Sequence, residues 1–151
     1  MLKKYSIFVL ILLGIGVRLW KFGQVPVGFN QDGAMGAVDA LALAHHGTDR
    51  FGMWLPAMLT GWGYSQMSAL LSYLTVPFIW IGGLSRYTAR MPTLLVSISG
   101  MIVLYYYSKL IFDKKVGLIT LALCSINPWH IMQSRWALDC NMFPHFFLLG
   151  L

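Results

Sequence analysis

Long apolar runs separated by short polar segments dominate the sequence. The runs cover residues 5–20, 67–84, 91–111 and 116–126, and another begins near Phe143. A helix needs about 20 apolar residues to cross the hydrocarbon layer of a bilayer. The runs lack the alternation of apolar and polar residues that marks the strands of membrane barrels. The pattern therefore predicts an all-α integral membrane protein.

The connection between the first two runs predicts a short helix lying against the membrane surface. In "DGAMGAVDALALAHHG", Asp32 stands near the positive start of the helix, and Gly47 stands where a glycine commonly ends one. Asp39 follows Asp32 by two helical turns, so the two lie on nearly the same face. We interpret Asp39 as part of a solvated amphipathic face; the alternative is a residue that supports Asp32.

The run at residues 67–84 has two interpretations. If it spans the membrane, Asp32 and Asp139 lie on opposite sides; if it lies flat, they lie on the same side. Pro77 and the pair Gly82–Gly83 weaken it as a straight span. The distribution of positive charge favours neither arrangement.

Composition supports the membrane interpretation. The chain has 58% hydrophobic and 11% charged residues, whereas soluble domains carry about 25% charged residues. The net charge of +6 comes from Lys and Arg scattered between apolar runs, which suits loop charges that set topology and does not suit nucleic-acid binding. No small-residue cleavage site follows the first run, so we expect an uncleaved first helix with a cytoplasmic N-terminus in a multi-pass protein of the cell membrane.

Five motifs occur in order along the chain. Arg18 closes the first run, and P-x-G-x-x-x-D follows at residues 26–32. The others are "HHGTDRFGMWLP", "GLSRYTARMP" and "NPWHIMQSRWALDCNMFP". This series resembles the glycosyltransferase family 39 group of the GT-C superfamily, which includes protein O-mannosyltransferases and aminoarabinose transferases of lipid A. Because the chain stops inside an apolar run, we expect it to be the N-terminal part of such a protein.

The resemblance implies a multi-span GT-C fold with juxtamembrane helices in the first outer loop. It treats residues 67–84 as part of that loop. It also implies transfer of a sugar from a polyprenyl-phosphate donor to a lipid, protein or polysaccharide acceptor on the extracytoplasmic face. The expected spans are about 5–22, 91–111, 116–132 and from 143 onward, with the outer loop at about 23–90.

The resemblance also assigns residues. Asp32 matches the presumed general base, Asp139 matches a second outer carboxylate, and Arg90 matches an arginine that precedes the next span. Gly33 stands where many relatives have Glu, and Gln66 stands nearest to a metal-binding Glu of the lipid A transferases. We therefore assign no metal ligands, and leave a divalent cation as a candidate cofactor only.

The chemistry of transfer fits these residue types. The acceptor hydroxyl must lose a proton as it attacks the anomeric carbon, which a carboxylate can accept; the alternative for Asp32 is a helix N-cap. Asp139 could orient the acceptor or bind a cation, or could simply hold a turn. Arg90, Arg135 and His130 are candidates for the donor phosphate, because guanidinium matches phosphate bidentately. The alternative for His130 is a polar residue at the membrane interface without a role in binding.

Two further functional interpretations stay open. A transporter or flippase of lipid-linked sugars would also carry charged residues inside its apolar segments. A non-catalytic membrane subunit could keep the fold without the chemistry. Under the transferase interpretation, we expect the 151-residue chain alone to be inactive, because donor binding normally draws on later helices. Arg18 is interpreted as a side chain that reaches the interface from the end of the first helix.

Overall fold

In the computed structural model, the chain is mostly helical, and the structure describes residues 2–150, with side chains from Tyr5 onward. The elements are α1 (Leu2–Leu19), α2 (Gln31–His46), β1 (Met58–Gly61), β2 (Ser65–Ser68), α3 (Leu70–Gly82), α4 (Arg86–Ile111), α5 (Lys114–Ile126), α6 (Pro128–Gln133), the 3₁₀ helix η1 (Asp139–Asn141) and α7 (Phe143–Gly150). The helical fold class is confirmed at this coarse level.

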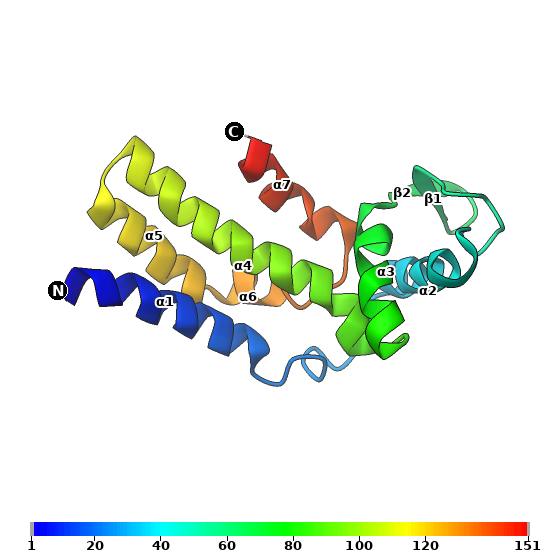
Figure 1. Cartoon of the computed structure of the whole chain (residues 1–151), viewed down its shortest axis with the longest axis horizontal. Coiled ribbons are helices and arrows are strands. Elements are labelled where there is room, and N and C mark those ends of the chain that lie inside the picture. Colours follow the sequence, from blue (N-terminus) through cyan, green and yellow to red (C-terminus); the bar gives the residue numbers. More distant parts are fainter. Residues whose placement is uncertain (1, 151) are drawn as a thin grey trace.

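The molecule has two parts, visible in Figure 1. Helices α1, α4 and α5 form an elongated helical layer, and α7 runs back along α4. At the other end, α2 packs against α3 and lies beside the hairpin of β1 and β2. We call this second part the end cap; it comprises residues 31–82.

One apolar cluster lies inside the helical layer and another lies where the two parts meet. In the helical layer, Met101, Tyr105 and Leu121 are buried, and α1 covers them with Ile7, Leu10 and Ile11. At the junction with the end cap, Leu71, Ala137 and Met142 form the second cluster. This second cluster lies where α3 meets the segment that carries Asp139.

Local capping explains where several helices begin and end. Gly47 ends α2 with φ 70°, in the left-handed region that glycine enters without a steric penalty. Ser85 and Thr88 bond reciprocally at the start of α4. The Asp113 side chain accepts from the Val116 N–H and starts α5. The Asn127 side chain caps α6, which divides the expected segment 116–132 into two helices.

One helix of the described chain, α4, is long and apolar enough to cross a membrane. The apolar helices Tyr5–Leu19 and Leu70–Gly82 are shorter. At 1.5 Å per residue, the 13 residues of α3 extend about 20 Å, less than the roughly 30 Å hydrocarbon layer. The first residues of the 67–84 run form part of β2, and α3 runs across the end of α4 in Figure 1.

Candidate functional site

Asp32 stands in the first turn of α2, but it does not cap the helix. The cap is Asn30, whose side chain accepts the backbone N–H of Asp32 at 2.8 Å. The Asp32 carboxylate is half-buried and accepts the indole N–H of Trp62 at 3.0 Å. The carboxylate is therefore directed toward the hairpin loop rather than toward the backbone of its own helix.

Gly33 brings the start of α2 against the segment that precedes Asp139. A Cβ atom added at Gly33 would lie 2.3 Å from the carbonyl oxygen of Ala137, closer than any side chain tolerates. A Glu at residue 33 would therefore not fit here. The absence of a side chain at residue 33 lets the two candidate carboxylates come from adjoining backbone segments.

Asp139 begins η1 and is also half-buried. Its Oδ2 accepts the backbone N–H of Ser68 at 3.0 Å, and its Oδ1 accepts the N–H of Cys140 at 2.8 Å. Ser68 is the last residue of β2. Oδ1 thus holds the local turn, which is the structural role that the sequence left open for Asp139. Oδ2 holds the hairpin.

The hairpin links the two carboxylates. Trp62, in its loop, donates to Asp32, and Ser68, at its end, donates to Asp139. Burial raises the pKa of the Cys140 thiol, and the nearby charges of Asp139 and Asp32 raise it further. One hairpin therefore contacts both candidate carboxylates.

Sequence reasoning missed the hairpin and with it Trp62. Its antiparallel register pairs Met58 with Ser68 and Gly61 with Ser65. The loop of residues 62–64 contains a glycine at φ 78°, and a three-residue loop with glycine between two short strands is a recognisable hairpin signal. The signal was missed because the aromatic residues of the loop, Trp62 and Tyr64, are also typical of a segment at the membrane interface.

The expectation that Asp39 lies on a solvated face is wrong. It is 1% exposed and forms an ion pair with Arg50 at 3.0 Å. Burial raises the pKa of the Asp39 carboxyl, and the backbone N–H and the charge of Arg50 oppose that shift. Arg50 also donates to the carbonyl of Thr60 in β1. The pair therefore fastens the hairpin to α2.

Arg90 is fully buried near the start of α4 and holds the segment that leads to Asp32. Its Nη2 donates to the carbonyls of Pro26 at 3.0 Å and Gly28 at 2.7 Å. Its guanidinium lies 5.4 Å from the centre of the Phe29 ring. Within the described chain, its Nε and Nη1 have no hydrogen-bond partner. Arg90 thus retains donors beyond those that hold the backbone.

Arg135 is directed to α1 and not to Asp139. Its Nη2 donates to the carbonyls of Val17 at 2.6 Å and Trp20 at 2.5 Å. Burial lowers the pKa of its guanidinium. Among residues 5–150, the only ion pair joins Asp39 and Arg50, so Arg135 has no carboxylate partner there. Arg135 therefore ties the end of α1 to the segment before η1.

His130 lies in α6, with its Nδ1 2.8 Å from Nη2 of Arg18 and 3.2 Å from Oγ of Ser97. Arg18 is 0% exposed and also donates to the carbonyls of Gly14 and Cys124. The interpretation of Arg18 as a side chain reaching the interface is therefore wrong. Backbone carbonyls, the Ser97 hydroxyl and the His130 imidazole inside the helical layer accept from its guanidinium instead.

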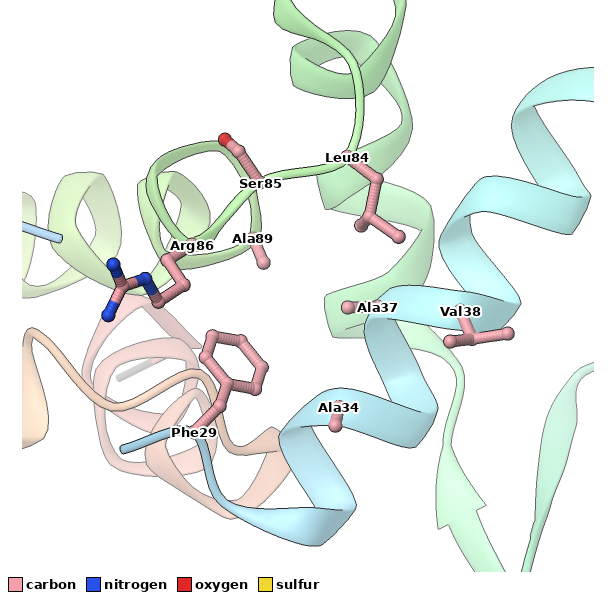
Figure 2. Close-up of a pocket in the computed structure, with 8 residues that line it drawn as sticks. All are labelled: Phe29, Ala34, Ala37, Val38, Leu84, Ser85, Arg86 and Ala89. Carbon is pink, nitrogen blue, oxygen red and sulfur yellow. The ribbon is translucent and has the colours of Figure 1, made fainter. Parts of the chain in front are cut away.

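A pocket of about 280 Å³ lies beside the start of α2 (Figure 2). Its lining is mainly apolar, with Phe29 and Leu84 facing the opening between α2 and the start of α4. Arg86 lies at its edge and donates to the carbonyl of Val27 at 3.2 Å. The pocket interior is apolar, and the Arg86 guanidinium points away from it. The full lining is Phe29, Ala34, Ala37, Val38, Leu84, Ser85, Arg86 and Ala89.

Comparison with known proteins adds no relatives. No protein-family model matches the chain. No curated protein and no solved structure matches it either. The functional argument therefore depends on the residues and their geometry.

Proposed function

We propose that the chain is part of a multi-pass membrane glycosyltransferase that moves a sugar from a polyprenyl-phosphate donor to an acceptor on the extracytoplasmic face. In this proposal the helical layer lies in the bilayer and the end cap lies outside it. The outward surface of the layer supports this placement, because large apolar side chains cover it on α1, α4 and α5. They include Phe8, Val9, Leu12, Leu95, Leu110, Ile119 and Leu123, all at least half exposed.

The proposed reaction is an inverting transfer. The acceptor oxygen forms a bond to the anomeric carbon while the bond from that carbon to the phosphate oxygen breaks, and the phosphate leaves with the electron pair. Asp32 accepts the proton of the acceptor hydroxyl, as a general base. Asp139 orients the acceptor from the adjoining segment. The transition state resembles an oxocarbenium ion, which a nearby carboxylate stabilises.

The observation that carries the proposal is that one hairpin hydrogen-bonds to both Asp32, through Trp62, and Asp139, through Ser68. The chain has five acidic residues in all, and two of them are held by this hairpin. The other three have separate duties: Asp39 pairs with Arg50, Asp49 holds a turn through the N–H groups of residues 51 and 53, and Asp113 caps α5.

The neighbouring pocket suits a donor that joins a lipid chain to a phosphate. Its apolar lining lies directly after the segment that Arg90 holds. Two donor nitrogens of the buried Arg90 have no hydrogen-bond partner in the described part of the chain, and in this proposal they bind the leaving phosphate. Arg86 lies at the edge of the pocket, with its guanidinium directed away from the interior. Arg135 supports the site from a distance, by fixing the segment that leads to Asp139.

The test is the substitution Asp32→Asn in the complete protein, assayed in membranes with a polyprenyl-phosphate sugar. We expect transfer to fall by roughly 10²–10⁴-fold, the usual contribution of a general base, while donor binding is retained. Asp113→Asn is the matched control, because asparagine caps a helix as well as aspartate does. Transfer by Asp32→Asn at the level of the control would contradict the assignment.

A transporter of lipid-linked sugars is the second candidate, and the buried Arg18 favours it. A guanidinium inside an apolar layer commonly marks a pathway for an anionic group. A transporter would move the substrate across sealed vesicles with its glycosidic bond intact. Neither the wild-type protein nor Asp32→Asn would then transfer sugar to an acceptor. Release of free polyprenyl phosphate during the assay separates the two candidates.

A further inference from the structure

The turn between α4 and α5 carries three lysines within seven residues. Lys109 lies in the last turn of α4, and Lys114 and Lys115 begin α5. Every residue from 109 to 116 is exposed. We call residues 109–116 the lysine turn. It lies at the end of the helical layer that is opposite to the end cap (Figure 1).

Gly117 lets the start of α5 pack closely on the last turns of α4. A Cβ atom at residue 117 would lie 3.0 Å from the carbonyl oxygen of Tyr105 and 3.1 Å from Cβ of Lys109. A larger residue at this position would push the two helices apart. The close approach therefore holds the lysine of α4 beside the two lysines of α5.

The positive charge of the lysine turn is only partly neutralised. Asp113 is its one acidic residue, so three lysines and one aspartate give a net charge of +2. The Asp113 carboxylate caps α5, and in the described part of the chain it forms no ion pair with a lysine. The other four acidic residues lie in the end cap or in η1, which contacts β2 of the end cap. The charge of this turn is thus free to attract an anion.

A pocket of about 410 Å³ opens at the lysine turn. Its lining consists of Asp113, Lys114, Lys115 and Leu118. It therefore presents two ammonium groups above one apolar side chain.

The same turn exposes three consecutive large apolar side chains. Leu110, Ile111 and Phe112 are 83%, 66% and 69% exposed. Apolar residues flanked by lysines suit the boundary between lipid head groups and acyl chains, where each part of the turn meets matching surroundings. A small soluble anion would satisfy the lysines but would leave these apolar side chains in water.

The length of α4 agrees with a position at the head groups. Its 26 residues extend about 39 Å at 1.5 Å per residue, whereas the hydrocarbon layer is roughly 30 Å thick. Tyr106 is exposed one turn before Lys109, whose Nζ lies 5.9 Å from the centre of the tyrosine ring. Aromatic residues followed by lysines are typical of a membrane interface. With α4 in the bilayer, its last turn reaches the head groups.

We propose that the lysine turn binds an anionic phospholipid, with the lysines around the head-group phosphate and Leu110, Ile111 and Phe112 among the first acyl carbons. A zwitterionic lipid fits less well, because its own ammonium group opposes the lysines. In the proposed orientation the turn faces the cytoplasmic leaflet, where anionic lipids create a negative surface potential. This inference rests on the proposed placement of the helical layer in the bilayer, and not on the chemistry at Asp32.

The experiment measures lipid binding to the complete protein in detergent by native mass spectrometry. The probes are phosphatidylglycerol, phosphatidylcholine and the soluble glycerol phosphate. The test variant combines Lys109→Gln, Lys114→Gln and Lys115→Gln, all at exposed positions, so folding should be retained. The first control replaces the same three lysines by arginine, which keeps the charge. The second control is Lys21→Gln, at an exposed lysine beyond the other end of α1.

We expect the dissociation constant for phosphatidylglycerol to rise roughly 10²-fold in the triple glutamine variant, because each lysine near an anionic head group contributes about a factor of five. The arginine variant and Lys21→Gln should bind as the wild type does. Phosphatidylcholine should bind the wild type more weakly than phosphatidylglycerol. Added salt should weaken the binding of phosphatidylglycerol.

Three results would overturn the inference: phosphatidylcholine binds as tightly as phosphatidylglycerol, the glutamine variant keeps wild-type affinity, or glycerol phosphate binds as tightly as the lipid. The last result would indicate a soluble anion and no role for the apolar side chains. The outcome is separable from that of the proposed function. Lipid binding by a protein that transfers no sugar would support the lysine turn alone, and sugar transfer with unchanged lipid binding by the glutamine variant would support the transferase alone.

Discussion

At the scale of single residues, Trp62 is the side chain that most directly holds Asp32. The hairpin loop places Trp62 at φ 55°, a left-handed conformation that costs a non-glycine residue about 1–2 kcal/mol. The bond from its indole to the Asp32 carboxylate offsets part of that cost. A smaller or more flexible residue would suit the loop better, so the indole at this position is best explained by its contact with Asp32.

The substitution Trp62→Phe tests this contact. It keeps an aromatic ring in the loop and removes the N–H donor to Asp32. We expect transfer to fall roughly tenfold because the carboxylate loses its fixed orientation, and the free energy of unfolding to fall by about 0.5–1.5 kcal/mol, the net value of one hydrogen bond. Steady-state transfer assays and thermal unfolding give the two quantities.

The control for Trp62→Phe is Tyr64→Phe, which changes a side chain in the same loop that is 88% exposed. It should leave both transfer and unfolding unchanged. Equal transfer by Trp62→Phe and Tyr64→Phe would show that Asp32 does not depend on the indole.

At the scale of elements, the ends of helices were the part that the sequence predicted best. The helix expected from Asp32 to Gly47 is α2, and Gly47 ends it as expected. Such signals are local: a glycine at a helix end acts through its own φ angle. The start of α2 was less predictable, because two residues there can cap the helix. Asn30 caps it, and Asp32, which the sequence offered as a cap, does not.

Long-range contacts could not be predicted in this way. The donors of Arg90 reach carbonyls more than 60 positions earlier in the chain, and Asp139 accepts from a backbone N–H 71 positions away. Arg135 spans 118 positions to Val17. A pattern of residue types identifies such side chains as candidates, but only the packing of elements decides which backbone they meet. The hairpin was missed because its strands are four residues each, too short for alternation to be recognised.

The contact of α2 with the segment before η1 gives a prediction at this scale. Gly33→Ala places a methyl group against the Ala137 carbonyl, so α2 and that segment must move apart. We expect a loss of about 1–3 kcal/mol in the free energy of unfolding, typical of overpacking, and a loss of transfer as Asp32 and Asp139 separate. Thermal unfolding in detergent and the transfer assay measure the two effects.

Gly16→Ala is the matched control, because nothing lies within 4 Å of a Cβ at Gly16 in α1. Alanine favours a helix by about 1 kcal/mol over glycine, so this variant should be as stable as the wild type or more so. If Gly33→Ala behaves like Gly16→Ala in both measurements, the close approach of the two segments does not hold.

At the scale of the whole molecule, the proposed orientation can be tested by labelling. Single cysteines are introduced at His46 and Lys114, in a background where Cys124 and Cys140 are replaced, and the complete protein is probed in sealed right-side-out vesicles. The two positions lie at opposite ends of the molecule in Figure 1, in α2 and at the start of α5. We expect an impermeant reagent to label position 46 at once, and position 114 only after permeabilisation.

Labelling of both positions from the same side would show that the helical layer does not span the bilayer. It would also contradict the proposed extracytoplasmic position of the site. The reversed pattern would place the end cap in the cytoplasm, where a polyprenyl-phosphate donor is not required because nucleotide sugars are present.

The distribution of the few carboxylates has a consequence for the interior of the molecule. Arg18, Arg90 and Arg135 are all buried, and none has an ion-pair partner in the described chain. Guanidinium groups keep their protons in proteins, so these charges persist at every physiological pH. The field inside the helical layer is therefore positive and weakly screened. A cation placed inside the layer would therefore be repelled by these groups, and a negative group would be attracted.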